Sequence, residues 1–135
     1  MTATPPALDL RYPIGTFSVP AEVTDDRRKE WIGAIAATPA NLRGAVRGLN
    51  ESQLETPYRD GGWTVRQVVH HLPDSHMNAL LRFKHALTEE NPVIKAYDES
   101  AWALLPDVAT TPVETSLSLL EALHDRWVAL IRGFR

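Results

Sequence analysis

The turn signal Asp60-Gly61-Gly62 constrains this chain more than any other stretch. Paired glycines lose the most backbone freedom on folding and tolerate positive φ, so the chain must turn here. The hydroxyl of Thr64 can then accept a hydrogen bond from a free N–H group of a first helical turn. We therefore predict a helix from about Thr64 to Leu87.

Polar residues gather on one narrow line of this predicted helix when its residues are placed about 100° apart on a wheel. The line contains His71, Ser75, Asn78 and Arg82. An apolar stripe lies directly beside it, formed by Val65, Val68, Leu72, Ala79, Phe83 and Ala86. The outer side carries Arg66, Gln67, Asp74 and Lys84, with His70 and His85 near its margins. We predict that the polar line faces the edge of the core and that His71, rather than its neighbour His70, points inward.

The composition is that of one globular domain, with 135 residues, of which 44% are hydrophobic and 23% charged. The net charge of −3 gives no indication of a nucleic-acid or anionic-membrane partner. There is no cysteine, so a metal site would use histidine or carboxylate. Because no signal peptide and no apolar run of about 18 residues are found, we expect a cytoplasmic protein.

Residues 1–23 form a proline-rich segment that we expect to be an extended arm lying over the end of a helical core. Thr24-Asp25-Asp26 then begins a helix, because acidic residues are favoured in a first turn. Pro39 predicts a kink or break in that helix. Its apolar stripe contains Trp31, Ile32, Ile35, Leu42, Val46 and Leu49, and its end is marked by Gly48 and Asn50.

The connection after the histidine-bearing helix, from Glu89 to Pro106, is long enough to be functional. Asp98 is placed to cap a short helix within it. Thr111-Pro112-Val113-Glu114 has the pattern of a capping box for a third long helix. Apolar residues recur every seven positions along that helix, at Val113, Leu120, Trp127 and Phe134, with Leu117, Leu123, Leu130 and Ile131 beside them.

Several of these motifs together resemble the YfiT branch of the DinB superfamily. They are Leu10-Arg11-Tyr12-Pro13-Ile14-Gly15, the run from Thr56 to Leu72, Asp74-Ser75-His76-Met77-Asn78, Arg82-Phe83-Lys84, Leu87-Thr88-Glu89-Glu90, Tyr97-Asp98-Glu99 with Trp102, Leu123-His124 and Arg126-Trp127. The resemblance covers nearly all of the chain from about Leu10 onward. It implies an all-α, up-down four-helix bundle, of which this sequence holds three long helices and lacks the fourth.

The resemblance also implies a metal site. Members of the family bind one divalent metal per subunit, zinc or nickel, through three histidines, and His71 matches the ligand on the second helix. The other two ligands belong to a His-x-x-x-His motif on the absent fourth helix. The implied activity is metal-dependent hydrolysis or transfer of a low-molecular-weight thiol such as bacillithiol to a small electrophilic molecule. Homodimers are implied as well, and the resemblance assigns no further catalytic residue.

Each candidate residue also has a purely structural interpretation. Without the resemblance, His71 is more simply a hydrogen-bonded histidine at the edge of the core. Arg82 either binds an anionic substrate group or pairs with a carboxylate. Ser75 lacks a base and an acid, which argues against a serine nucleophile. Packing roles are expected for His76 and His124, each with a bonded ring nitrogen, and for Trp31, Trp63, Trp102 and Trp127.

Pro73 lies two residues after His71, inside the predicted helix. A proline at such a position costs roughly 3 kcal/mol and should bend the helix beside the ligand. Two alternatives to the enzyme therefore stay open. The chain is either a non-catalytic fragment that needs a partner, or a small-molecule-binding or interaction module that has lost its complete metal site.

Overall fold

The computed structural model describes residues 6–134, and in this range the chain forms helices and no strand. The helices are α1 (Asp25–Val46), α2 (Glu51–Leu54), α3 (Val65–Thr88), α4 (Glu99–Trp102), α5 (Pro106–Thr110) and α6 (Val113–Gly133). The predicted all-α class and the three long helices are confirmed. None of the helices in the described range combines the length and the apolarity needed to cross a membrane.

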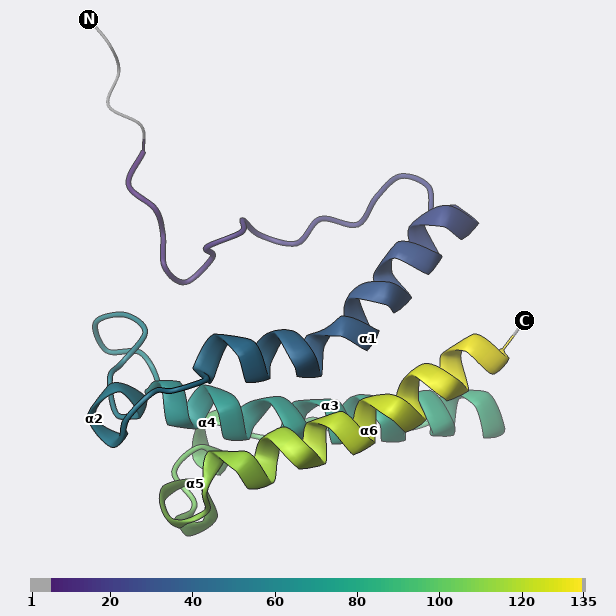
Figure 1. Cartoon of the computed structure of the whole chain (residues 1–135). Helices are drawn as coiled ribbons and strands as arrows, with labels where there is room; N and C mark the ends of the chain where they lie inside the picture. The colour runs from purple at the N-terminus through teal and green to yellow at the C-terminus, as the bar shows by residue number, and fades with distance from the viewer. Residues whose placement is uncertain (1–5, 135) are drawn as a thin grey trace, which may run out of the picture.

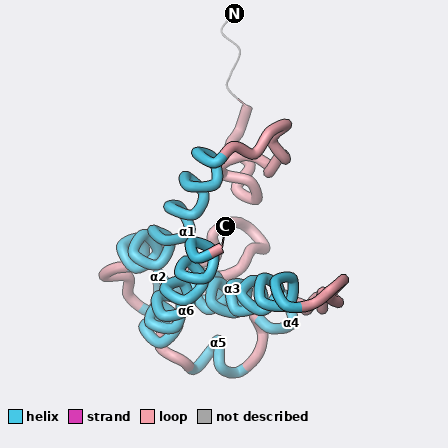
Figure 2. The backbone as a smooth tube through the Cα atoms, turned by 90° about the vertical axis from the view of Figure 1, so that its right-hand side faces the viewer, coloured by secondary structure: helices cyan, strands magenta, loops and turns pink. Residues whose placement is uncertain are grey.

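The three long helices pack side by side, with α6 in contact with both α1 and α3 (Figure 1). The up-down order holds between α1 and α3, whereas α6 runs in the same direction as α3. This parallel pair arises because the connection after α3 returns along the bundle before α4 and α5 begin. Figure 2 shows the short helices α2, α4 and α5 and the loops around the long ones. The short helices pack against α3.

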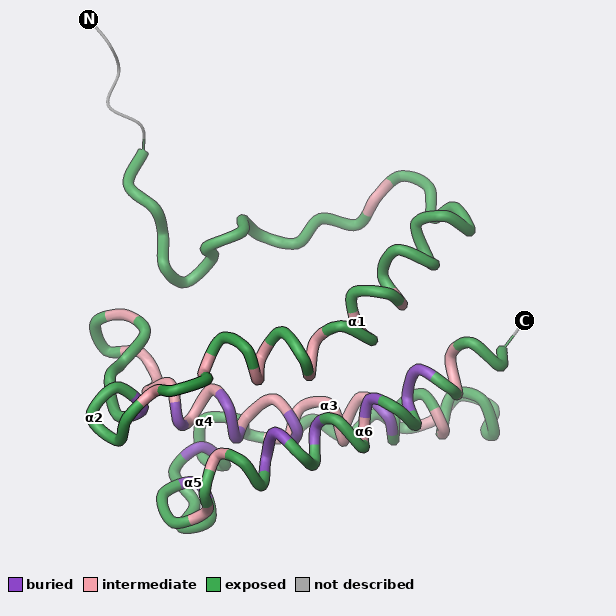
Figure 3. The backbone as a smooth tube through the Cα atoms, viewed as in Figure 1, coloured by how far each residue is buried: buried purple, intermediate pink, exposed green. Residues whose placement is uncertain are grey.

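The first long helix begins as the sequence predicts and bends where it predicts. The Thr24 hydroxyl accepts a hydrogen bond from the Arg27 N–H at 3.2 Å. Pro39 lies inside α1, and Figure 1 shows α1 bending between an N-terminal half that leaves the bundle and a C-terminal half that lies along it. No residue of α1 is buried, so this helix covers one side of the pair α3 and α6 only loosely (Figure 3).

The segment before α1 does not cover the core as we expected. Residues 6–23 contain no helix or strand, and their large apolar side chains are exposed. Ile14 is 99% exposed and Phe17 is 83% exposed. The first five residues of the expected arm lie outside the described residues.

Helix α3 is capped at its start by a reciprocal pair of hydrogen bonds. The Thr64 hydroxyl accepts from the Gln67 N–H at 3.1 Å, and the Gln67 side chain accepts from the Thr64 N–H at 2.9 Å. The helix then continues through Pro73 to Thr88 without a break. Pro73 itself is among the fully buried side chains, so its ring contributes to the core at the position where its missing N–H weakens the helix.

The predicted capping box at the start of α6 does not form. Thr111 instead ends α5, because its N–H donates to the Asp107 carbonyl at 2.9 Å, and Pro112 occupies the N-cap position without a side-chain cap. Glu114 bonds to Arg43 of α1 at 2.7 Å rather than reaching back to a backbone N–H. Glu114 therefore ties α6 to α1.

The core lies between α3 and α6. Its buried hydrophobic residues are Leu54, Val69, Leu80, Ala103, Val108, Leu117, Leu120, Trp127 and Val128. Figure 3 shows the buried positions along the facing sides of α3 and α6. Four polar side chains are buried with them, namely Arg66, His70, Ser116 and His124.

Candidate metal centre

Two adjacent histidines of α3 have opposite roles, and the sequence prediction of which one points inward was wrong. His70 is only 5% exposed, whereas His71 is half-buried. Adjacent residues differ by about 100° around a helix, so the two rings face different surroundings. The buried face of α3 is centred on Val69, His70 and Pro73 instead of on the predicted apolar stripe.

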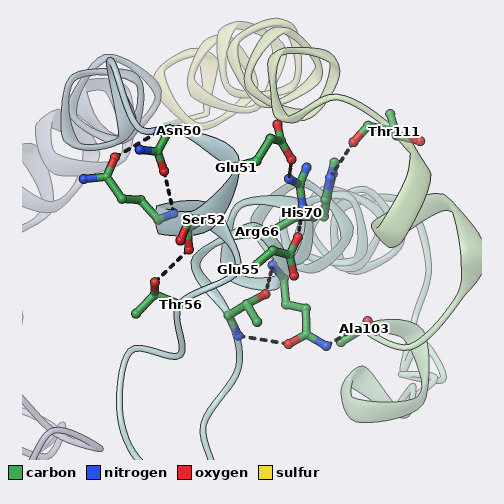
Figure 4. Close-up of polar contacts among 12 residues, drawn as sticks. Asn50, Glu51, Ser52, Glu55, Thr56, Arg66, His70, Ala103 and Thr111 are labelled. Atoms are coloured by element: carbon green, nitrogen blue, oxygen red, sulfur yellow. Dashed lines mark hydrogen bonds and ion pairs between the residues drawn. The ribbon is translucent and has the colours of Figure 1, made fainter.

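His70 joins α3 to the segment around the start of α6 (Figure 4). Its Nε2–H donates to the Thr111 carbonyl at 3.0 Å. This fixes the neutral tautomer, and Nδ1 then accepts from the Ser116 hydroxyl at 2.6 Å. Burial lowers the pKa of His70, which keeps the ring neutral in this arrangement.

A serine bonded to a histidine is also the arrangement of a nucleophile and its base, and no motif in the sequence indicated this pair. Both residues are closed off from solvent, however, because Ser116 is 8% exposed and His70 is 5% exposed. The Ser116 hydroxyl thus lies inside the protein rather than at a surface that a substrate contacts. We therefore assign the contact between His70 and Ser116 to structure.

His71 lies beside the turn that precedes α3. Its ring meets the edge of Trp63, with 4.8 Å between ring centroids. Burial lowers the pKa of His71, against smaller opposing effects of the Asp74 and Glu99 carboxylates. Neither of its ring nitrogens has a hydrogen-bond partner among residues 6–134, whereas His70, His76, His85 and His124 are all bonded. His71 thus combines a neutral imidazole with free ring nitrogens.

His76 and His124 form a second histidine pair, between α3 and α6. The His124 Nδ1–H donates to the Ile35 carbonyl of α1 at 2.7 Å, so its Nε2 must be the acceptor for the His76 Nδ1–H at 2.5 Å. Trp127 packs on both rings, at 5.4 Å from each. The predicted packing role of these histidines, each with a bonded ring nitrogen, is confirmed.

The other members of the predicted polar line do not converge with His71. Asn78 donates to the Asp74 carbonyl of its own helix at 2.8 Å. Arg82 is exposed, and its guanidinium donates to the Lys95 carbonyl at 3.2 Å, not to a carboxylate. Ser75 is half-buried. Of the histidines on α3, His71 is therefore the one with both ring nitrogens free within the described part of the chain.

Arg66, which we predicted on the outer side of the helix, is 7% exposed. It is enclosed by two carboxylates of the segment from α2, as Figure 4 shows: Nε bonds to Glu55 at 2.5 Å, and Nη2 bonds to Glu51. Gln67 beside it donates to the Ala103 carbonyl at 3.2 Å. The short helix α2 was not predicted, so nothing in the sequence pattern indicated a buried arginine at this position.

Residues 6–134 contain no group of three histidine or carboxylate side chains placed to hold one metal ion. Asp74 and Glu99 act on the charge of His71 but do not complete a ligand set with it.

Comparison with known proteins places this helical arrangement in a family. Residues 21–135 match the DinB superfamily. The chain belongs to the DinB superfamily. Among its DinB relatives, a protein of Geobacillus thermodenitrificans named as a candidate metal-dependent hydrolase is 58% identical over 124 residues, which cover 92% of this chain and 70% of the relative. A protein of Oceanobacillus iheyensis with the same description is 57% identical, over 90% of this chain and 70% of its own length.

The DinB fold itself is shown by a solved structure, that of YfiT from Bacillus subtilis, described as a candidate metal-dependent hydrolase with an unusual four-helix bundle topology. It superposes on this chain with a TM-score of 0.90 and 52% sequence identity, over 93% of this chain and 72% of YfiT. The recognition of the YfiT branch from the sequence motifs is confirmed. The parallel course of α3 and α6 is a property of this DinB chain that the sequence motifs did not reveal.

Proposed function

We propose that His71 is a ligand of a divalent metal, zinc or nickel, in a metal-dependent hydrolase or thiol S-transferase. One observation carries the proposal: within residues 6–134, His71 is the histidine whose ring nitrogens have no hydrogen-bond partner. Metal binding requires the neutral imidazole, and burial favours that form of His71. The names of the relatives, as metal-dependent proteins, support the same assignment.

A single imidazole is an incomplete ligand set, and the described residues do not supply the rest. Catalytic zinc sites in proteins use three protein ligands. We propose that a His-x-x-x-His motif, as the resemblance implies, completes the site with His71. A divalent metal held in this way lowers the pKa of a bound water or thiol and so supplies a nucleophile near neutral pH.

The residues of this chain would prepare His71 for that role. Trp63 packs edge-on against its ring and limits its rotation. The carboxylates of Asp74 and Glu99 add negative charge near the site, which favours a cation there. We further propose that the substrate is a small molecule, with a low-molecular-weight thiol as co-substrate in the transferase case, and that the protein acts as a homodimer.

The alternative is that the chain is a non-catalytic fragment or a small-molecule-binding or interaction module without a working metal site. The incomplete ligand set in residues 6–134 favours this second candidate. The two proposals differ in whether metal binding depends on His71 and whether bound metal brings activity.

The test is a titration of the isotope-labelled chain with Ni²⁺, followed by NMR. We expect paramagnetic broadening to appear first at His71 and Trp63, and to disappear from Trp63 in His71→Ala. His85→Ala is the matched control, because His85 is an exposed histidine whose ring is bonded to Glu89 at 2.8 Å. The proposal would be contradicted by broadening that begins at other residues and is the same in His71→Ala as in the parent chain.

Activity is measured on the metal-loaded chain as consumption of cysteine by an electrophile such as 1-chloro-2,4-dinitrobenzene, and as hydrolysis of an activated ester. Acceleration that is lost in His71→Ala and kept in His85→Ala supports the enzyme. A folded chain that binds no metal through His71 and accelerates neither reaction supports the alternative.

A further inference from the structure

A hollow of about 430 Å³ lies between the turn before α3 and the start of α4. Both of its walls are at the N-terminal end of α3, although they are distant in the sequence (Figure 1). Trp63 lines the hollow and also contacts His71, with 4.8 Å between the ring centroids. The hollow therefore adjoins the proposed metal ligand.

Two opposite charges line this hollow without neutralising each other. Arg59 comes from the turn, and Glu99 from the first turn of α4. Among residues 6–134, Arg59 forms no ion pair, and the Glu99 carboxylate has neither an ion-pair nor a hydrogen-bond partner. The hollow thus presents a cation and an anion that are both available to a ligand.

The guanidinium of Arg59 is held in place by its surroundings. Its Nε–H donates to the Tyr58 hydroxyl and its Nη1 donates to the Asp60 carbonyl, each at 3.0 Å. It also lies over the Tyr58 ring, 5.4 Å from the centroid. Two of the five N–H groups of the guanidinium are used in this way, which leaves donors free for an anionic partner.

Gly62 provides the space in which Arg59 lies. A Cβ atom at Gly62 would be 2.6 Å from Cγ of Arg59 and 3.0 Å from Cε1 of Tyr58. The Gly62 N–H donates to the Arg59 carbonyl at 3.0 Å and closes the turn. The turn is therefore shaped to hold Arg59 against Tyr58, which lowers the entropy lost when a ligand binds.

We propose that this hollow binds the head group of a small zwitterion of the α-amino-acid type, with its carboxylate on Arg59 and its ammonium on Glu99. The Trp63 side chain, next to His71, receives the apolar part of the same molecule. The assignment of this ligand as the substrate of the metal site depends on the proposed function. The binding itself needs no metal.

The probe is S-methyl-L-cysteine, which carries both charges but no free thiol, titrated without metal into the labelled chain. We expect a saturable shift of the Trp63 indole signal. Arg59→Gln and Glu99→Gln should each weaken binding about tenfold, the effect of losing one charge-assisted contact. The matched controls Arg126→Gln and Glu90→Gln remove exposed charges outside the hollow and should leave binding unchanged.

Modified probes assign each charge to its partner. The N-acetyl derivative lacks the ammonium, so its weaker binding should be insensitive to Glu99→Gln and still sensitive to Arg59→Gln. The methyl ester lacks the carboxylate and should show the reverse. Gly62→Ala should displace Arg59 and therefore weaken the parent compound while sparing the methyl ester; thermal unfolding shows whether each variant stays folded.

The inference is overturned if the Trp63 signal does not saturate with S-methyl-L-cysteine, L-cysteine or L-alanine up to tens of millimolar. It is also overturned if the hollow variants behave like the two controls. His71→Ala separates this inference from the proposed function, because zwitterion binding should survive it. A chain that binds the zwitterion but no metal would refute the metal site alone.

Discussion

The Nδ1 atom of His124 lies 2.7 Å from the carbonyl oxygen of Ile35, the acceptor that Pro39 leaves without a helical donor. In a regular helix, the carbonyl of residue 35 accepts from the N–H of residue 39, and proline has none. Pro39, which bends α1, thus leaves free the carbonyl oxygen to which the buried His124 of α6 donates. The same bond fixes the tautomer of His124 and, through it, that of His76.

His124→Ala should lower the free energy of unfolding by about 3 kcal/mol, because it leaves a cavity and deprives the Ile35 carbonyl of its partner. Pro39→Ala returns a helical N–H to that carbonyl. In the double variant the loss of His124 should therefore cost about 1 kcal/mol less than in the parent. Urea denaturation of the four proteins measures this coupling, and strictly additive effects would contradict it.

Stability should fall as the pH is lowered, and His76 should account for much of the fall. Burial, then the nearby rings of His124 and His71, lower the pKa of His76 from 6.5 to about 4. Between pH 6.5 and about 4, His76 is protonated in the unfolded chain and neutral in the folded chain. Stability is therefore highest above the unfolded value and decreases as the pH drops towards about 4.

The expected loss over this window is roughly 2 kcal/mol once solvent screening of a partly exposed ring is allowed for. His76→Gln should flatten the pH dependence of the unfolding free energy, measured with urea at several values from neutral to acidic. If the unfolding free energy of His76→Gln depends on pH as steeply as that of the wild type, His76 is not the group responsible.

Local signals in the sequence predicted local structure well. Thr24, Thr64 and Asp98 cap helices as expected, because a cap depends on residues within one turn. The exception is Thr111, whose N–H is taken by the end of α5, a helix that the sequence pattern did not reveal. The capping box cannot form here, because Thr111, its first residue, is already the C-cap of α5.

Long-range contacts explain what the sequence could not predict. A helical wheel places His70 and His71 about 100° apart, but it does not say which of them meets Ser116 on α6. Arg66 is buried because Glu51 and Glu55 reach it from α2, and charge alone suggested the opposite. His71 was identified as a candidate metal ligand from the family motifs. The helical wheel alone would not have supported it, because the wheel predicted His71 to be the more buried histidine and the structure buries His70 more deeply.

Substitution of His70 should lower stability, whereas substitution of its neighbour His71 should affect metal binding and leave stability nearly unchanged. His70→Ala removes the partner of the buried Ser116 hydroxyl and of the Thr111 carbonyl, so it should lower the free energy of unfolding by about 3 kcal/mol. His71→Ala breaks no hydrogen bond among the described residues and should cost about 1 kcal/mol or less. Thermal unfolding in the absence of metal tests the contrast. Equal losses in both variants would contradict the different environments of the two rings.

The two carboxylates around Arg66 should act as substitutes for each other. Glu51 and Glu55 have side chains that are 84% and 58% exposed, whereas the Arg66 side chain is 9% exposed. Removing one carboxylate leaves the buried guanidinium with the other, so Glu51→Gln and Glu55→Gln should each cost about 1 kcal/mol or less.

Removing both carboxylates leaves a buried cation without any anion, and the double variant should lose about 3 kcal/mol, more than the sum of the single losses. The control is Glu22→Gln with Glu90→Gln, which changes the net charge equally at two exposed positions. Urea denaturation at neutral pH measures all five proteins. If the double variant shows only the sum of the single effects, Arg66 does not depend on this pair, because additivity is the behaviour of independent sites.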